Sequence, residues 1–195
     1  MLAGLADLRA SEDPQDQALV SVAEGFTAAA RRQPRAALGH ARAVLAHADA
    51  LGISHDFLWW AWPLAARAAH DLGDADTVGE LLILLDNYQP GHLAPMLRAE
   101  RNLARARLAA ADGGPDAAAA FAAAISSMRE QSTPYHLAHG LLDHARYLTG
   151  LPDAEAATRA AGDARAIADH LRCQPLLDRA ADLTPAAPPA PAATV

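Results

Sequence analysis

The stretch GGPDAAAAFAAAISSMREQSTPYHLAHGLLDHARYLTGLPDAEAATRAAGDARAIADH, residues 113–170, decides the fold class. It holds three segments of helical length in which alanine and leucine recur with a period of about 3.6 residues. Proline- and glycine-containing breaks at residues 132–134 and 150–152 divide them. The same punctuation continues through the chain. It predicts helices near 14–32, 35–51, 55–71, 75–88, 94–111, 116–131, 134–149 and 153–172, and a short one near 175–183.

A repeat is visible in the pairs Arg35-Ala36, Asp74-Ala75, Asp116-Ala117 and Asp153-Ala154, which begin equivalent segments. They are spaced by roughly 40 residues, a period typical of stacked helical hairpins. We therefore expect an all-α chain, an α-solenoid of about four tetratricopeptide-like hairpins plus a capping helix. Trp62 and Ala66 fit the tetratricopeptide pattern of large and small positions, but no pair carries all of it.

The composition agrees with this fold class. Hydrophobic residues make up 52% of the chain, mostly as alanine, and aromatic residues only 5%, so little material is left for strands. All 16 basic residues are arginine and the formal charge is −7, which argues against nucleic acid as a partner. Cys173 is the single cysteine, and charged residues interrupt both the first 20 positions and every apolar run. We expect a cytoplasmic protein without a membrane span.

Three regions are expected along the chain. Residues 1–12 predict a partial leading helix, because Leu2, Leu5 and Leu8 recur at helical spacing. Residues 13–183 form the repeat domain. Residues 184–195 are rich in proline and alanine and carry no charge, which predicts a disordered tail.

Possible metal chemistry is confined to His136, His139 and Asp143, which share one helix face at positions i, i+3 and i+7. His144, however, falls in an apolar stripe with Leu141, so histidine also serves as packing here. We favour a solvated or groove-lining face over a zinc site and expect no metal.

An aromatic cluster gathers Phe57, Trp59, Trp60 and Trp62 within six positions. The favoured interpretation is a core anchor for the second hairpin, and the alternative is a ligand groove. Pro63 lies inside this helix and should remove the hydrogen bond to the Trp59 carbonyl, producing a kink.

Arg98, Arg101 and Arg105 form a further stripe at i, i+3 and i+7. Such a line suits an acidic peptide or a phosphate, although like charges four residues apart repel one another. A solvated face is the simpler interpretation.

A resemblance to a known family is carried by three segments: residues 133–142 (TPYHLAHGLL), 171–180 (LRCQPLLDRA) and 60–65 (WAWPLA). They resemble the carboxy-terminal helical repeats of large bacterial signalling ATPases, which often also hold a class III adenylate/guanylate cyclase or a LuxR-type DNA-binding domain. The likeness covers most of residues 17–183 and is strongest after Glu100. It implies a sensor or scaffold arm whose nucleotide chemistry belongs to other domains.

No catalytic residue is expected, because the sequence holds no phosphate loop, GxSxG, HExxH or CxxC motif, and no cofactor is expected either. We hypothesise a non-catalytic interaction or scaffold module whose concave groove binds a protein or peptide segment, such as an ATPase or cyclase domain. The alternative is a small-molecule effector sensor that uses the aromatic cluster. The expected contact residues are Trp59, Arg98, Arg101, Arg105, His136 and His139.

Overall fold

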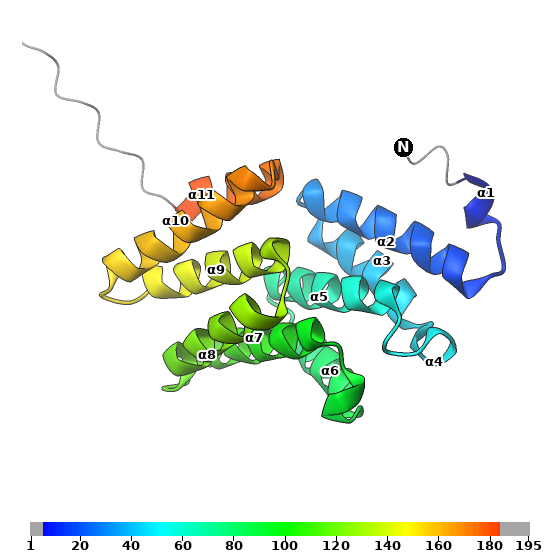
Figure 1. The fold of residues 1–195 in the computed structure, drawn as a ribbon, viewed down its shortest axis with the longest axis horizontal. Helices are drawn as coiled ribbons and strands as arrows, with labels where there is room; N and C mark the ends of the chain where they lie inside the picture. The colour runs from blue at the N-terminus through cyan, green and yellow to red at the C-terminus, as the bar shows by residue number, and fades with distance from the viewer. Residues whose placement is uncertain (1–5, 184–195) are drawn as a thin grey trace, which may run out of the picture. The chain divides into compact units, whose positions relative to one another are not determined.

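The fold is helical throughout the part of the chain that the computed structural model describes, residues 6–183 (Figure 1). No strand occurs within these residues. None of the described helices is both long and apolar enough to cross a membrane. The elements are α1 (Ala6–Arg9), α2 (Pro14–Ala30), α3 (Pro34–Leu45), α4 (Ala48–Leu51), α5 (Asp56–Asp71), α6 (Ala75–Asp86), the 3₁₀ turn η2 (Pro90–His92), α7 (Pro95–Ala111), α8 (Ala117–Gln131), α9 (Pro134–Thr149), α10 (Ala154–His170) and α11 (Gln174–Leu183).

The predicted helices are confirmed with one exception. The helix expected over 35–51 is wrong as a single element, because α3 ends at Leu45 and α4 begins at Ala48. The break at Ala46 and His47 redirects the chain so that Ala48 and Ile53 are both buried. The leading helix is described only as α1, and the tail expected at 184–195 lies outside the described residues.

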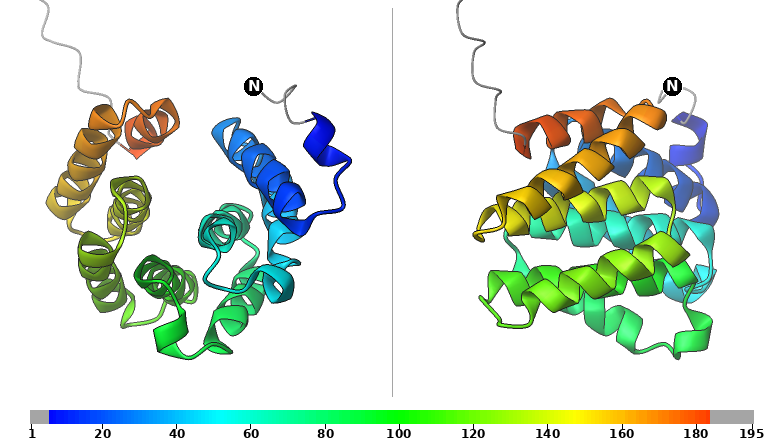
Figure 2. Two further views of the ribbon diagram at one scale, coloured as in Figure 1. Left: turned by 45° about the vertical axis from the view of Figure 1, so that its right-hand side comes forward. Right: turned by 60° about the vertical axis from the view of Figure 1, so that its left-hand side comes forward.

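The chain divides into two compact units, Met1–Thr133 and Pro134–Val195. In the first unit α2 pairs with α3 and α7 pairs with α8 along their lengths (Figures 1 and 2). Helix α5 packs against α2, α3, α6 and α7 and is the central element of that unit. In the second unit α9 pairs with α10, and α11 contacts both.

Four helices end in the same hydrogen-bonded turn, a Schellman motif. The second residue after the last helical one has a positive φ, at Arg32, Gly73, Gly113 and Arg172. The next backbone N–H donates to the carbonyl oxygen five residues back, and that acceptor is always an alanine: Ala28, Ala69, Ala109 and Ala168, at 2.8–3.0 Å. Three of these turns join the helices of successive hairpins in the first unit, at intervals of roughly 40 residues.

Aspartate side chains cap the helix starts at three places. Asp13, Asp74 and Asp153 accept hydrogen bonds from the backbone N–H groups of Gln15, Thr77 and Ala156. The hydroxyl and backbone N–H of Thr77 hold the pKa of Asp74 below its ordinary value. Asp116 also directly precedes its helix, α8, but makes no side-chain cap bond. Arg35 lies inside α3, so the equivalence predicted for the four helix starts holds in position for three of them and in capping for two.

Trp62 anchors the core of the first unit. Its side chain is fully buried, and its indole Nε1–H donates to the Leu81 carbonyl oxygen at 2.8 Å, tying α5 to α6. On the other side of α5, Gly25 brings the α2 backbone so close that an added Cβ would lie 2.8 Å from Leu64 Cδ2. Helix α5 runs unbroken through Pro63, which is buried.

The second unit packs small side chains. The cluster shared by α9 and α10 consists of Ala145, Leu148, Ala157, Ala160 and Ala161, and Leu183 of α11 lies against it. Alanine at these contacts lets the helix backbones approach closely. The apolar area buried per residue is correspondingly small.

The Schellman turns predict opposite effects for two glycine substitutions. Gly113→Ala should lower the free energy of unfolding by about 1 kcal/mol, because an L-residue is disfavoured at positive φ. A Cβ there meets nothing within 4 Å, so the cost is conformational. The matched control Gly79→Ala, inside α6 and equally uncrowded, should raise stability by about 0.5–1 kcal/mol. Urea denaturation followed by circular dichroism measures both, and equal effects would contradict this role of the turn.

Candidate functional site

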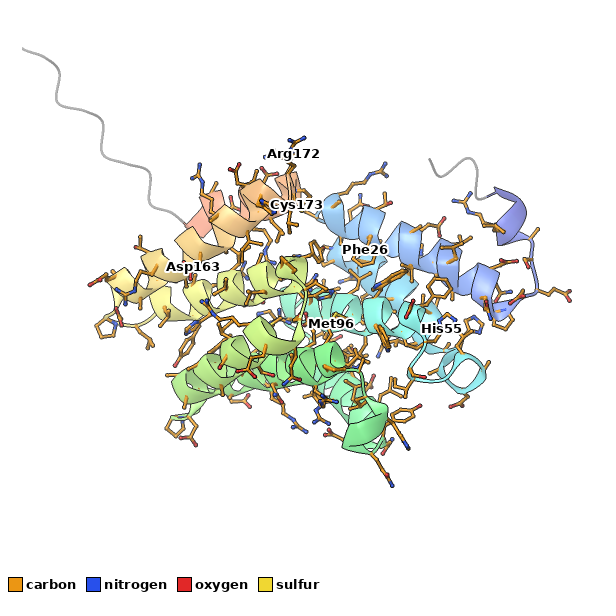
Figure 3. The ribbon with its side chains drawn as sticks, in the orientation of Figure 1. Phe26, His55, Met96, Asp163, Arg172 and Cys173 are labelled. Carbon is orange, nitrogen blue, oxygen red and sulfur yellow. The ribbon has the colours of Figure 1, made fainter. Side chains whose placement is uncertain are left out.

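The most exposed aromatic surface lies at the start of α5. His55 caps this helix, its Nδ1 accepting from the Phe57 backbone N–H, and the two rings lie 4.9 Å apart. Phe57 and Trp60 follow each other on one helix face with ring centroids at 5.8 Å. Trp60 is 40% exposed. We call His55, Phe57, Trp59 and Trp60 the α5 aromatic patch; Figure 3 labels His55.

Trp59 supplies a polar group to this patch. Its ring packs partly against the core, and its indole Nε1 is buried without a hydrogen-bond acceptor among the described residues. A buried donor of this kind is costly unless an acceptor reaches it. The three tryptophans thus divide: Trp62 is core, Trp60 faces outward, and Trp59 lies between.

All three arginines of the predicted stripe on α7 donate hydrogen bonds to acceptors within the first unit. Asp86, at the end of α6, accepts from Arg101 at 3.2 Å and from Arg105 at 2.8 Å. Arg98 donates to the Leu93 carbonyl oxygen at 2.8 Å. The mutual repulsion expected along the stripe is therefore relieved by a carboxylate that bridges two of its members, a contact that spacing on one helix does not reveal.

A buried ion pair joins α5 to α7. Arg67 Nη2 lies 3.8 Å from Glu100 Oε1, and the two side chains are 7% and 1% exposed. Arg107, two turns further along α7, is also buried. Sequence reasoning missed these residues. The available signal was their position, because Glu100 and Arg107 follow Leu97 and Ala104 in the apolar stripe of the helix.

The second unit contains a buried polar cluster on α9. His136, His139 and Asp143 are all buried, so of the two alternatives expected for this face, solvated or groove-lining, the solvated one is wrong. Arg179 of α11 donates to Asp143 Oδ1 at 2.9 Å and to His139 Nδ1 at 2.5 Å. Accepting that bond requires His139 Nδ1 to be unprotonated. Tyr135 packs edge-on against the His139 ring at 4.7 Å.

The ligand-type residues on this face make contacts within the protein. The guanidinium of Arg179 binds one carboxylate oxygen of Asp143 and the Nδ1 atom of His139. Within residues 6–183, no group of three histidine, cysteine or acidic side chains is placed to hold a metal ion. Cys173 is a free, partly buried thiol at the α10–α11 turn.

A hollow of about 240 Å³ lies elsewhere in the first unit, between α1, α2 and the α3–α4 region. It is lined by Arg9, Gln17, Val20, Ser21, Ala43 and His47. None of these residues belongs to the α5 aromatic patch. This hollow therefore does not enclose Trp59 or Trp60 as a ligand pocket would.

The predicted contact residues fall into both units. Trp59, Arg98, Arg101 and Arg105 belong to the first, and His136 and His139 to the second. No family model, curated protein or solved structure matches the chain. The α5 aromatic patch is the candidate site that the geometry of the described residues supports best.

The Arg179–Asp143 pair predicts a strong coupling in stability. Arg179→Met should cost about 3–5 kcal/mol, because it removes the cation from a carboxylate that is 1% exposed. Adding Asp143→Asn should recover part of that loss, and a double-mutant cycle by urea denaturation measures it. Arg159→Met is the control, since its pair with Glu155 is exposed and should contribute less than about 1 kcal/mol. Additive losses would contradict the pairing.

His144 predicts a pH dependence. Burial lowers the pKa of its imidazole, so the folded state disfavours the protonated ring. Its contribution to stability is constant above the ordinary pKa of 6.5 and is lost as pH falls through the lowered value. Wild type should lose more stability between pH 7.5 and 5.5 than His144→Gln, measured by urea denaturation at both pH values. Identical losses would show that this ring does not contribute.

Proposed function

We propose that this chain is a non-catalytic protein–protein interaction or scaffold module, an α-solenoid of tetratricopeptide-like hairpins. The observation that carries the proposal is the α5 aromatic patch, in which the exposed Trp60 ring lies beside the partly buried Phe57 ring on the central helix of the first unit. Exposed aromatic residues of this kind dominate the binding energy of protein interfaces. The recurring Schellman turns support the repeat architecture.

The partner that fits this patch is a protein or peptide segment. Trp60 offers an apolar face that is open to a partner, whereas the Trp59 N–H is buried beneath the surface. The resemblance to the repeat regions of bacterial signalling ATPases extends the proposal to a cytoplasmic signalling or regulatory system. There the chain would act as an arm toward an ATPase or cyclase domain.

The polar residues of the chain support a binding role over catalysis. Asp143 and His139 are held by Arg179, Glu100 by Arg67, and Asp86 by two arginines. A general acid or base needs to reach a substrate proton. In this chain the contacts of these groups join one helix to another.

A small-molecule effector sensor is the second candidate, favoured by the buried Trp59 N–H without an acceptor. In that case a compact ligand with a carbonyl or carboxylate would fill the patch. Native mass spectrometry of chain purified from its source cell would detect such a ligand as an added mass, and its absence would favour the peptide partner.

The interaction role is tested by site-specific photocrosslinking. A benzophenone amino acid in place of Trp60 should capture a partner protein in cell lysate, identified by mass spectrometry. The same group in place of Ile83, which is 63% exposed on α6, is the matched control and should not capture that protein.

The captured protein is then purified for direct binding. Trp60→Ala should weaken its affinity at least about tenfold, as for an interface hot spot, while Ile83→Ala leaves it unchanged. Equal capture at both positions, or equal affinity of both variants, would refute the α5 aromatic patch as the contact surface.

A further inference from the structure

Helix α11 packs against α9 and α10 together, and we call the surface that these two helices present to it the α9–α10 groove. Leu176 and Ala180 are each 1% exposed, and Leu183 lies against the small-residue cluster of α9 and α10. These three positions follow the i, i+4, i+7 spacing of an amphipathic helix laid into a groove. Gln174, Ala181 and Asp182 remain on the exposed side.

A charge contact adds selectivity to this groove. Arg179 crosses from α11 to Asp143 and His139 on α9. The Asp143 side chain is 1% exposed, whereas that of Arg179 is 18% exposed. A buried carboxylate that loses its cation is strongly destabilised. Any occupant of the groove must therefore bring a positive group to this position.

Two features of α11 indicate that this helix can be displaced from the α9–α10 groove. It has 10 residues, and isolated helices shorter than about 12–15 residues are marginal in water. It is joined to α10 through Arg172, which adopts positive φ without the freedom of glycine. Figure 3 shows Arg172 and Cys173 together at this turn, at one end of α11. The helical state of α11 thus depends on the groove.

We infer that the α9–α10 groove is a helix-binding site and that α11 is its built-in competitor. The partner is an amphipathic helix that carries leucine, arginine and a small residue at the spacing of Leu176, Arg179 and Ala180. Such a helix displaces α11 by making the same apolar contacts and the same ion pair with Asp143. This surface is separate from the α5 aromatic patch, so failure of one proposal leaves the other standing.

The test uses the full chain and a fluorescein-labelled peptide of sequence QPLLDRAADL, the sequence of α11. In the full chain, Leu176→Ala weakens docking of α11 but leaves the groove intact. Fluorescence anisotropy should show the peptide binding this variant at least tenfold more tightly than wild type. Adding Asp143→Asn should reverse the gain at least tenfold. A peptide with Glu in place of Arg179 is the matched control and should not bind.

A second measurement works in wild type and does not depend on the fold of any variant. Cys173, the single cysteine, lies at the α10–α11 turn, where its N–H is bonded to the Ala168 carbonyl oxygen. Displacement of α11 should raise the rate of thiol reaction with an aromatic disulfide at least threefold, saturably with peptide and not with the Glu-containing control.

Three results would overturn the inference. The first is no change in Cys173 reactivity up to millimolar peptide together with equal affinity of wild type and Leu176→Ala. The second is equal binding of the two peptides. The third is a dimer of the Leu176→Ala chain by light scattering that the peptide dissociates, because it would assign the groove to α11 of a second copy.

Discussion

The left-handed residue at the end of α2, α5, α7 and α10 fixes how the chain turns back on itself. In each case the following N–H reaches the carbonyl oxygen of an alanine in the last turn of the helix. This bond satisfies a carbonyl that the helix end would leave unpaired and sets the direction in which the next helix starts. Two of the four positions are arginine, so the geometry is kept even where glycine is not available. The α2–α3, α5–α6 and α7–α8 hairpins and the turn from α10 to α11 depend on it.

The alanine-rich contacts between these helices have a physical consequence. Alanine lets helices approach closely but removes little apolar area from water, so each contact contributes little hydrophobic stabilisation. The chain concentrates apolar volume in a few large anchors, above all Trp62 with its bond to Leu81. It also places ionic pairs between helices, Arg67 with Glu100 and Arg179 with Asp143. Such buried pairs are selective about their partner, because either member alone is strongly unfavourable.

The sequence predicts the helices well because helical period and punctuation are local. Proline, glycine and aspartate mark nearly every boundary, and Asp74 and Asp153 act as the caps that their positions suggest. The break after Leu45 was not predicted, since Ala46 and His47 carry no local signal and the break serves the burial of Ile53. The pairing of Arg101 and Arg105 with Asp86, and of His139 with Arg179, also escaped prediction. Those contacts join residues at least 15 positions apart, which a face drawn on one helix does not show.

The α5 aromatic patch differs from these alanine-rich helix contacts. In a chain with 5% aromatic residues, Trp60 is left 40% exposed while alanines fill much of the core. Burying a ring of that size stabilises a fold more than any alanine contact does. The folded chain is therefore less stable than it would be with the Trp60 ring buried. Trp59, one residue earlier, also buries an N–H without giving it an acceptor among the described residues. Neither feature stabilises the folded chain by itself. The exposed Trp60 ring becomes favourable once an apolar surface covers the start of α5, which is the physical reason for proposing a binding surface there.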